Sequence, residues 1–405
     1  MEKALISTRR YDLDWLRVIA FSLLILYHCG MGYVQDWGWH VKNPDTSESF
    51  QLWMLFVNRW RMALLFMISG AGVWFSMKRR TPAKFAGERF TRLFIPLAFG
   101  MLFIVPPQIY FERLTQGVHF DNYWQFQLSV FQFVPYPDGG SLSWHHLWYL
   151  PYILVYSLLC LPFFLYWRSE KAARVREKLQ ATFAKYPWLL FAVFLLPGIA
   201  EGILQPYFPT THNLTHDWAN FTSSLLVFLI GYILASHIGF IQTISKYRKT
   251  WLGVALVLVT ILYAFYWLPD DVELSDTHRF FYRLLNAANA WAWLLAILGF
   301  GYRYLNFNTP FLQYTNQAVY PFYILHQTIT ITLVYYMLDW QVGVLPKFAV
   351  AVIGTFGISF LLYEFIIRRI RLLYPFFGLK GEQPASPTPQ NRTNIALETA
   401  PIKDL

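Results

Sequence analysis

Three ionisable side chains interrupt a stretch that is otherwise almost entirely apolar, LDWLRVIAFSLLILYH (Leu13–His28). If this stretch is a helix, Arg17 and His28 share one face, because eleven positions are about three turns with a lateral offset of only ~20°. They would lie ~16 Å apart along the axis, with Asp14 about one turn below Arg17, where it could pair with Arg17 and set its position. An imidazole can accept or donate a proton near neutral pH, and a guanidinium can bind a carboxylate or a phosphate. What these groups do depends on the environment that the rest of the chain creates.

The composition indicates a membrane. Of the 405 residues, 56% are hydrophobic, 20% are aromatic and only 14% are charged, which excludes an ordinary soluble domain. Apolar runs of about 20 residues, long enough to cross a bilayer, recur along the chain. We therefore predict an all-α, polytopic integral membrane protein with about ten transmembrane helices, near residues 13–34, 53–76, 93–111, 147–167, 188–205, 218–237, 251–268, 285–302, 319–338 and 346–367.

The loops between the predicted spans alternate in charge. MKRRTPAKFAGERFTR, WRSEKAARVREKLQATFAKYP and SKYRKT are basic, whereas LPDDVELSDTH is acidic. By the positive-inside rule both termini and the 77–92 loop are predicted to be cytoplasmic, and the loops at 36–51 and 112–145 to face outward. The net charge of +10 is then explained by cytoplasmic loops, so we expect no nucleic-acid partner. We expect one membrane domain over residues 1–371 and a largely disordered cytoplasmic tail over 372–405.

At membrane depth an ionisable group is costly unless it faces the protein interior or a water-filled cavity. Arg17 and His28 are therefore candidate functional residues. The alternative is a histidine that hydrogen-bonds a neighbouring helix, together with an arginine that reaches the cytoplasmic headgroups.

Several motifs, in order, resemble the membrane acyltransferase-3 family, which includes bacterial O-antigen acetyltransferases and glucan succinyltransferases. LDWLR with a histidine after ten further residues resembles the family's first-helix signature. FMISG resembles the end of its second helix, and ERFTRLFIP contains its Arg-x-x-Arg pair, Arg89 and Arg92. HHLWYLPYILVYSLL resembles the opening of its fourth helix, and VYPFYILHQTI its late segment with another histidine, His326. The resemblance covers residues 11–371.

The resemblance implies transfer of an acyl group such as acetyl or succinyl from cytoplasmic acyl-CoA to a hydroxyl of an envelope glycan or lipid-linked sugar. It places the chain in the bacterial inner membrane, with acyl-CoA as a co-substrate and no permanently bound cofactor. Arg17, Arg89 and Arg92 would bind the phosphates of CoA at the cytoplasmic entrance. The pantetheine arm would run along the first helix to His28, the general base, with His326 as a second catalytic residue. Positive-inside anchoring for Arg89 and Arg92, and a structural role for His326, are the alternatives.

Two further pairs are candidates for substrate binding. Arg59 and Arg61 lie in the outer half of the second predicted span, where they need water or acidic partners and could bind an anionic acyl group or acceptor. His146 and Trp148 open the fourth span from the outer side. They could contact substrate, cap the helix or belong to an interfacial aromatic belt.

Other polar residues give weaker signals. Glu201, Asn286 and Asn289 are intramembrane polar groups, although asparagines often serve as contacts between helices. His212 and His216 have a helical spacing that suits a metal, but there is no His-Glu-x-x-His pattern and we expect no metal site.

Two other classes of membrane protein, a transporter and a non-catalytic scaffold, are alternatives to the enzyme. A multi-pass transporter could use the same side chains as a substrate or proton path, but we detect no internal repeat and no pair of broken helices. A membrane scaffold would leave Arg17 and His28 without a purpose. The motif order favours the enzyme.

Overall fold

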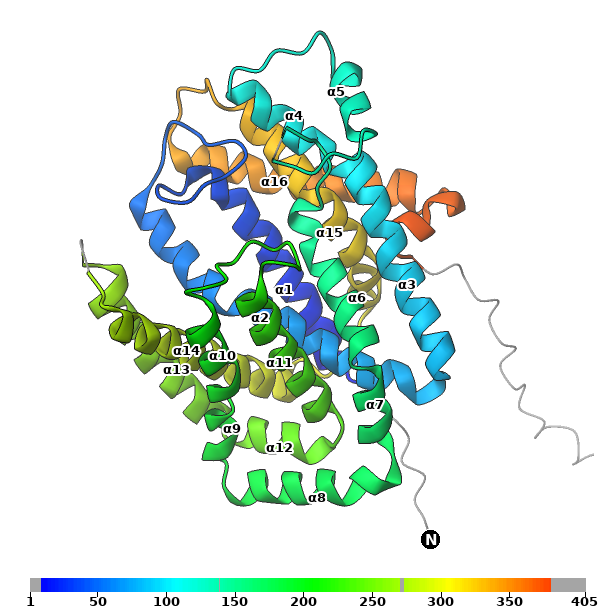
Figure 1. Ribbon diagram of the computed structural model, residues 1–405, viewed down its shortest axis with the longest axis vertical. Helices are drawn as coiled ribbons and strands as arrows, with labels where there is room; N and C mark the ends of the chain where they lie inside the picture. Colours follow the sequence, from blue (N-terminus) through cyan, green and yellow to red (C-terminus); the bar gives the residue numbers. More distant parts are fainter. Residues whose placement is uncertain (1–8, 138, 270–272, 380–405) are drawn as a thin grey trace, which may run out of the picture.

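The computed structural model describes residues 9–137, 139–269 and 273–379, and within these ranges it is all-helical, without a β-strand (Figure 1). This confirms the prediction of an all-α protein. The long and short α-helices are α1 (Tyr11–Gly30), α2 (Glu48–Ser76), α3 (Pro82–Phe99), α4 (Pro106–Thr115), α5 (Tyr123–Val130), α6 (Tyr149–Leu159), α7 (Leu161–Arg168), α8 (Glu170–Lys185), α9 (Trp188–Ala192), α10 (Leu195–Leu204), α11 (Trp218–Ala235), α12 (Ile238–Lys246), α13 (Arg248–Leu262), α14 (Asp276–Tyr304), α15 (Pro310–Tyr336) and α16 (Val344–Leu362).

Short 3-10 and π segments join or extend these helices. They are η1 (Met31–Tyr33), η2 (Met77–Arg79), η3 (Gly100–Ile104), η4 (His145–Trp148), η5 (Tyr263–Trp267), η6 (Tyr363–Ile367), η7 (Arg371–Leu373) and η8 (Pro375–Phe377).

Fewer helices than the ten predicted are long and apolar enough to count as membrane spans. Seven helices of the described chain are long and apolar enough to cross a membrane, or up to nine if two bent pairs each count as one span. The bends are 54° between α6 and α7 and 111° between α8 and the α9–α10 segment. The protein is therefore a multi-pass membrane protein, and the count of ten and the sidedness of the termini stay predictions.

The ends of several long helices are fixed by local sequence. Ser47, Thr81 and Thr309 each accept a hydrogen bond from a backbone N–H in the first turn of α2, α3 and α15. Proline at the first position of α3 and α15 fits because its missing N–H has no partner to lose there.

Two helices at the centre of the fold position the candidate residues. α1 packs against both α2 and α15, and α15 also packs against α16 and α4 (Figure 1). α15 is as long as the spanning helices but more polar, because it carries Asn316, His326 and Gln327 in its interior. Polar groups on α15 can therefore meet those of α1 inside the bundle.

The closest helix contact, between α2 and α11, depends on two glycines. A Cβ on Gly70 would stand 1.8 Å from the carbonyl oxygen of Phe228, and a Cβ on Gly231 would stand 2.1 Å from that of Met67. The backbones touch directly, as is common between membrane helices with small residues at the interface. Gly70 closes the FMISG motif, which accounts for the glycine at that position.

Two regions differ from the sequence expectations. The basic segment 167–187, which we expected to be a loop, contains helix α8. This helix lies across one end of the bundle, with Leu179 and Phe183 packed on the core (Figure 1). Residues 371–379 form η7 and η8, and Phe377 is buried. The tail predicted to be largely disordered begins at 372, so η8 and the buried Phe377 depart from that prediction, and the rest of the tail, 380–405, lies outside the described residues.

Candidate active site

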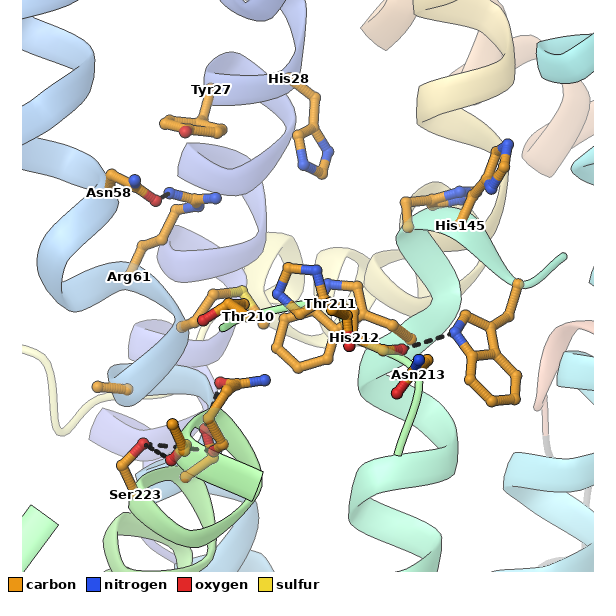
Figure 2. Close-up of a pocket in the computed structure, with 18 of the residues that line it drawn as sticks. Tyr27, His28, Asn58, Arg61, His145, Thr210, Thr211, His212, Asn213 and Ser223 are labelled. Carbon is orange, nitrogen blue, oxygen red and sulfur yellow. Dashed lines mark hydrogen bonds between the residues drawn. The ribbon is translucent and has the colours of Figure 1, made fainter. Parts of the chain in front are cut away.

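A cavity of about 1250 Å³ opens beside the C-terminal half of α1, and most of the candidate residues line it. His28 reaches it from α1 and the arginines of the second span from α2, while η4 contributes its other side (Figure 2). The sequence-predicted residues in its wall are His28, Arg59, Arg61, His146, Trp148, Glu201, Asn286 and His212.

His28 and His326 form the central contact of the site. Nδ1 of His28 lies 2.7 Å from Nε2 of His326, and Nδ1 of His326 lies 2.7 Å from the carbonyl oxygen of Tyr323. A carbonyl can only accept, so Nδ1 of His326 carries a proton and, in the neutral ring, Nε2 accepts from His28. Nε2 of His28 is then left with its lone pair and makes no hydrogen bond to any described residue. His326 is fully buried, whereas His28 is half-buried in the cavity wall.

His146 is held by both ring nitrogens. Its Nε2 lies 3.0 Å from the carbonyl oxygen of Ile324, and its Nδ1 accepts from Nε2 of Gln108 at 3.3 Å. The ring stands at 88° to that of His326, with the ring centres 5.1 Å apart. Both ring nitrogens of His146 are bonded to other protein atoms, and the predicted contact of this residue with substrate stays a prediction.

Arg59 and Arg61 both line the cavity, and neither forms an ion pair with a described residue. The guanidinium carbon of Arg61 lies 3.4 Å from the ring centre of Tyr27, and its Nη1 donates to Oδ1 of Asn58 at 2.5 Å (Figure 2). Arg59 donates to the hydroxyl of Tyr282 at 3.2 Å. The Nε atoms of both arginines are buried without a hydrogen-bond partner. The cavity wall therefore holds cationic groups that an anionic or polar ligand could satisfy.

Trp148 forms the opposite wall together with His212. Their rings stack at 4.1 Å, and Trp144 donates to the backbone oxygen of His212 at 2.9 Å. Burial lowers the pKa of His212 to about 4, so this ring is neutral at neutral pH. His216 bonds Thr215 instead and does not join His212 in a metal-ligating group. Trp148 thus lies in the cavity wall, where a flat ring could contact a sugar.

Arg17, Arg89 and Arg92 lie together at the other end of α1, close enough to influence one another electrostatically. Arg17 pairs with Asp14 at 3.1 Å, as the spacing predicts, and also bonds Asn316 on α15. The Nη2 atom of Arg89 donates to Oγ of Ser76, which is 3.3 Å away.

Arg92, like Arg89, is bonded to an uncharged group. Its Nη2 atom lies 3.3 Å from the backbone oxygen of Gly378, to which it donates. Among the described residues neither Arg89 nor Arg92 has a carboxylate partner within ion-pair distance. The two guanidinium groups could therefore bind an anionic ligand.

Comparison with known proteins identifies the family of the chain. The profile of the acyltransferase domain matches residues 10–364, most of the chain. The chain belongs to the acyltransferase-3 family. It is 24% identical over 397 residues to glucans biosynthesis protein C of Escherichia coli strain K12, covering 94% of this chain and 98% of that protein. The proteins of the same name from Shigella dysenteriae serotype 1 and from Escherichia coli O6:K15:H31 are similar to the same extent. As an acyltransferase-3 protein, the chain is a membrane enzyme that transfers acyl groups.

A packed aromatic layer separates the two ends of this acyltransferase-3 site. Phe21 shares the face of α1 with Arg17 and His28, and its ring meets those of Tyr149 and Tyr323 edge to face at 6.3 and 5.2 Å. All three aromatic residues are buried. The predicted path along this face is therefore filled in this conformation, and a pantetheine arm that followed it would require these rings to move.

Some residues of the site are absent from the sequence predictions. Trp39, in the connection between α1 and α2, stacks on His28 with ring centres 5.6 Å apart. His40 follows it, and it meets Glu112 and His145 from two other segments in a group that could hold a metal ion. No spacing rule connects these residues, because they come from loops and helix ends that only tertiary packing brings together.

Proposed function

We propose that the protein is an O-acyltransferase of the bacterial inner membrane. It moves a short acyl group such as acetyl or succinyl from acyl-CoA, supplied from the cytoplasm, to a hydroxyl of an envelope glycan or lipid-linked sugar. His28 is its general base and His326 positions that base. Acyl-CoA is a co-substrate and not a permanently bound cofactor.

The observation that carries this proposal is the hydrogen-bonded chain from His28 through His326 to the Tyr323 carbonyl. It directs an unprotonated Nε2 into a cavity that also contains unpaired arginines. Both ring nitrogens of His326 and of His146 are bonded to protein atoms, whereas Nε2 of His28 faces the cavity, where a substrate hydroxyl can reach it. Nucleophile activation by an oriented imidazole is a general feature of acyl transfer.

The reaction balances with these groups alone. Nε2 of His28 takes the proton of the acceptor hydroxyl as the oxygen attacks the thioester carbonyl. The tetrahedral intermediate carries a negative oxygen, which Arg61 is placed to stabilise from the cavity wall. When the intermediate collapses, the C–S bond breaks, and the imidazolium returns the proton to the sulfur of CoA. The products are the O-acyl ester and CoA thiol.

The donor side is supported by charge. CoA carries phosphate groups, and Arg17, Arg89 and Arg92 offer three neighbouring guanidinium groups, two of them without acidic partners. Guanidinium–phosphate contacts are among the stronger hydrogen bonds because both partners are charged. The thioester reaches His28 when the Phe21 layer opens.

The acceptor side is supported by the relatives and by the cavity wall. Proteins named for glucan biosynthesis match almost their full length, which favours a glycan acceptor. Trp148 and Trp39 offer flat rings to a sugar face, and Arg59 and Arg61 suit a dicarboxylic acyl group such as succinyl.

The test uses purified full-length protein in detergent, supplied with acetyl-CoA or succinyl-CoA and an envelope glycan extract. Free CoA thiol and acylated glycan are measured together, the latter by mass spectrometry. We expect thiol release that depends on the acceptor, with ester formed in equal amount. Acceptor-independent thiol release without ester, or no consumption of either donor, would contradict the proposal.

A further inference from the structure

A second group of ligand-type side chains borders the same cavity, with His40 and His145 in its wall and Glu112 in contact with His40. Nδ1 of His40 lies 2.5 Å from Oε2 of Glu112, and the ring of His145 stacks on that of His40 with centres 4.4 Å apart. His40 comes from the α1–α2 connection, Glu112 from α4 and His145 from the start of η4. One potential ligand atom from each residue lies within 4.8 Å of the other two. The acyl-transfer chemistry proposed above uses none of them.

This set of side chains has the composition of a zinc site with an open position. Two imidazoles and one carboxylate bind Zn²⁺ at about 2.0–2.2 Å in such sites, and the fourth position is left for water or substrate. Tetrahedral ligand atoms at that radius are about 3.3 Å apart. The observed separations, from 2.5 Å to within 4.8 Å, therefore need only side-chain adjustments to accept an ion.

The surrounding contacts orient two of the residues as ligands. Oε1 of Glu112 accepts from the hydroxyl of Tyr136 at 2.6 Å, so Oε2 is the atom turned toward His40, and an ion would replace its present contact with Nδ1 of that ring. Nδ1 of His145 lies 2.7 Å from Oγ of Ser143, while Nε2 of His145 is buried and has no hydrogen-bond partner among the described residues. Metal-bound histidines characteristically use their other nitrogen in this way. A buried nitrogen without a partner is uncommon and points to a missing ligand.

We propose that His40, Glu112 and His145 bind one Zn²⁺ ion in the cavity wall. His40 and His145 both line the cavity, so the open coordination position is accessible from it. Trp39 lies between this site and His28, with its ring 5.2 Å from that of His40 and 5.6 Å from that of His28. The ion is thus separate from the general base, and it offers a positive centre to an oxygen of a molecule bound in the cavity.

The direct experiment measures metal on untagged full-length protein in detergent. The protein is stripped with a chelator, loaded with ZnCl₂ and passed through a desalting column, and bound zinc is determined by mass spectrometry. We expect one Zn²⁺ per wild-type chain, and binding at least about tenfold weaker for His145→Ala and Glu112→Gln. His216→Ala, a change in an exposed outer-loop histidine, is the matched control and keeps wild-type binding.

A second measurement uses only the wild-type protein, so it does not depend on whether the variants fold. Co²⁺ titrated into the wild-type protein gives the visible absorption of a four-coordinate site, and Zn²⁺ raises the melting temperature of the wild type. Stoichiometry well below one with no cobalt spectrum overturns the proposal, and so does wild-type zinc affinity in both ligand variants. None of these readouts depends on acyl transfer, so the zinc site and the proposed activity stand or fall separately.

Discussion

Nδ1 of His28 and Nε2 of His326 lie 2.7 Å apart although 298 positions separate the two residues. The partner that orients His28 is thus a neutral ring whose own proton is held by a backbone carbonyl. A carboxylate would stabilise the imidazolium more strongly once the base has taken its proton. A thioester donor, with its good leaving group, is a substrate for which this weaker assistance suffices.

The role of His326 can be separated from a packing role by two substitutions. We expect His326→Leu to lower kcat about 10–100-fold, because Nδ1 of His28 loses its acceptor and the base loses its fixed tautomer. His326→Gln offers a side-chain oxygen at a similar reach and should restore much of the rate.

The readout is kcat per folded molecule and its pH profile, with donor KM as the internal control. A merely structural histidine would lower the folded yield in both variants and leave the kcat of the folded fraction near wild type. That result would remove His326 from the account.

The group of arginines near the N-terminal end of α1, described above, is expected to act on donor binding. Arg89→Ala and Arg92→Ala should each raise the KM for acyl-CoA about 10–100-fold, because loss of one charge-assisted contact costs ~1.5–3 kcal/mol. Turnover at saturating donor should stay near wild type, since the phosphates are remote from the reacting carbonyl. Lys84→Ala, on the exposed first turn of α3, is the control for loss of positive charge. A collapse of kcat at unchanged donor KM would refute the binding role.

Arg61 tests the reacting end of the cavity. Its guanidinium lies flat against Tyr27, so Arg61→Lys keeps the charge but loses the planar stacking and the bond to Asn58. With acetyl-CoA as donor, which has no distal carboxylate, we expect kcat to fall about 10–100-fold with donor KM within about twofold of wild type. Steady-state kinetics with either substrate varied distinguish these effects, and a defect confined to donor KM would show that Arg61 serves another purpose.

The α2–α11 contact gives a prediction about stability alone. Gly70→Ala should lower the melting temperature in detergent, because its Cβ would overlap the Phe228 carbonyl and force the helices apart, at a cost of ~1–3 kcal/mol. Gly72→Ala, two positions away with nothing within 4 Å of the new Cβ, should be neutral or stabilise by up to about 1 kcal/mol. Equal melting temperatures for the two variants would show that the close approach is not tight.

Helical spacing carried the most reliable information in the sequence. It placed Arg17 and His28 on one face and paired Arg17 with Asp14, because both relationships follow from the geometry of a single helix. The motif VYPFYILHQTI drew attention to His326, but only tertiary packing shows that its ring meets His28. The helix over 170–185 was missed because its basic residues were read as a cytoplasmic loop, although Leu179 and Phe183 recur at helical spacing.

The cavity wall was the least accessible to sequence reasoning. His40, Glu112 and His145 belong to segments separated by dozens of positions, so no local sequence pattern predicts that they are in contact. His146 and Trp148 were singled out as the opening of a span, yet their contacts with Ile324 and His212 come from distant segments. The filled layer at Phe21 likewise depends on two other helices and has no signature in α1 alone.

The most direct test of the account is the specific activity of His28→Ala and of the near-isosteric His28→Gln, measured per folded molecule beside acyl-CoA binding, with His216→Ala as control. If His28 is the general base, both variants lose at least ~10²-fold in kcat while the folded yield and donor affinity stay close to those of the wild type. Activity within about tenfold of wild type in both variants would contradict the assignment of His28 as the base.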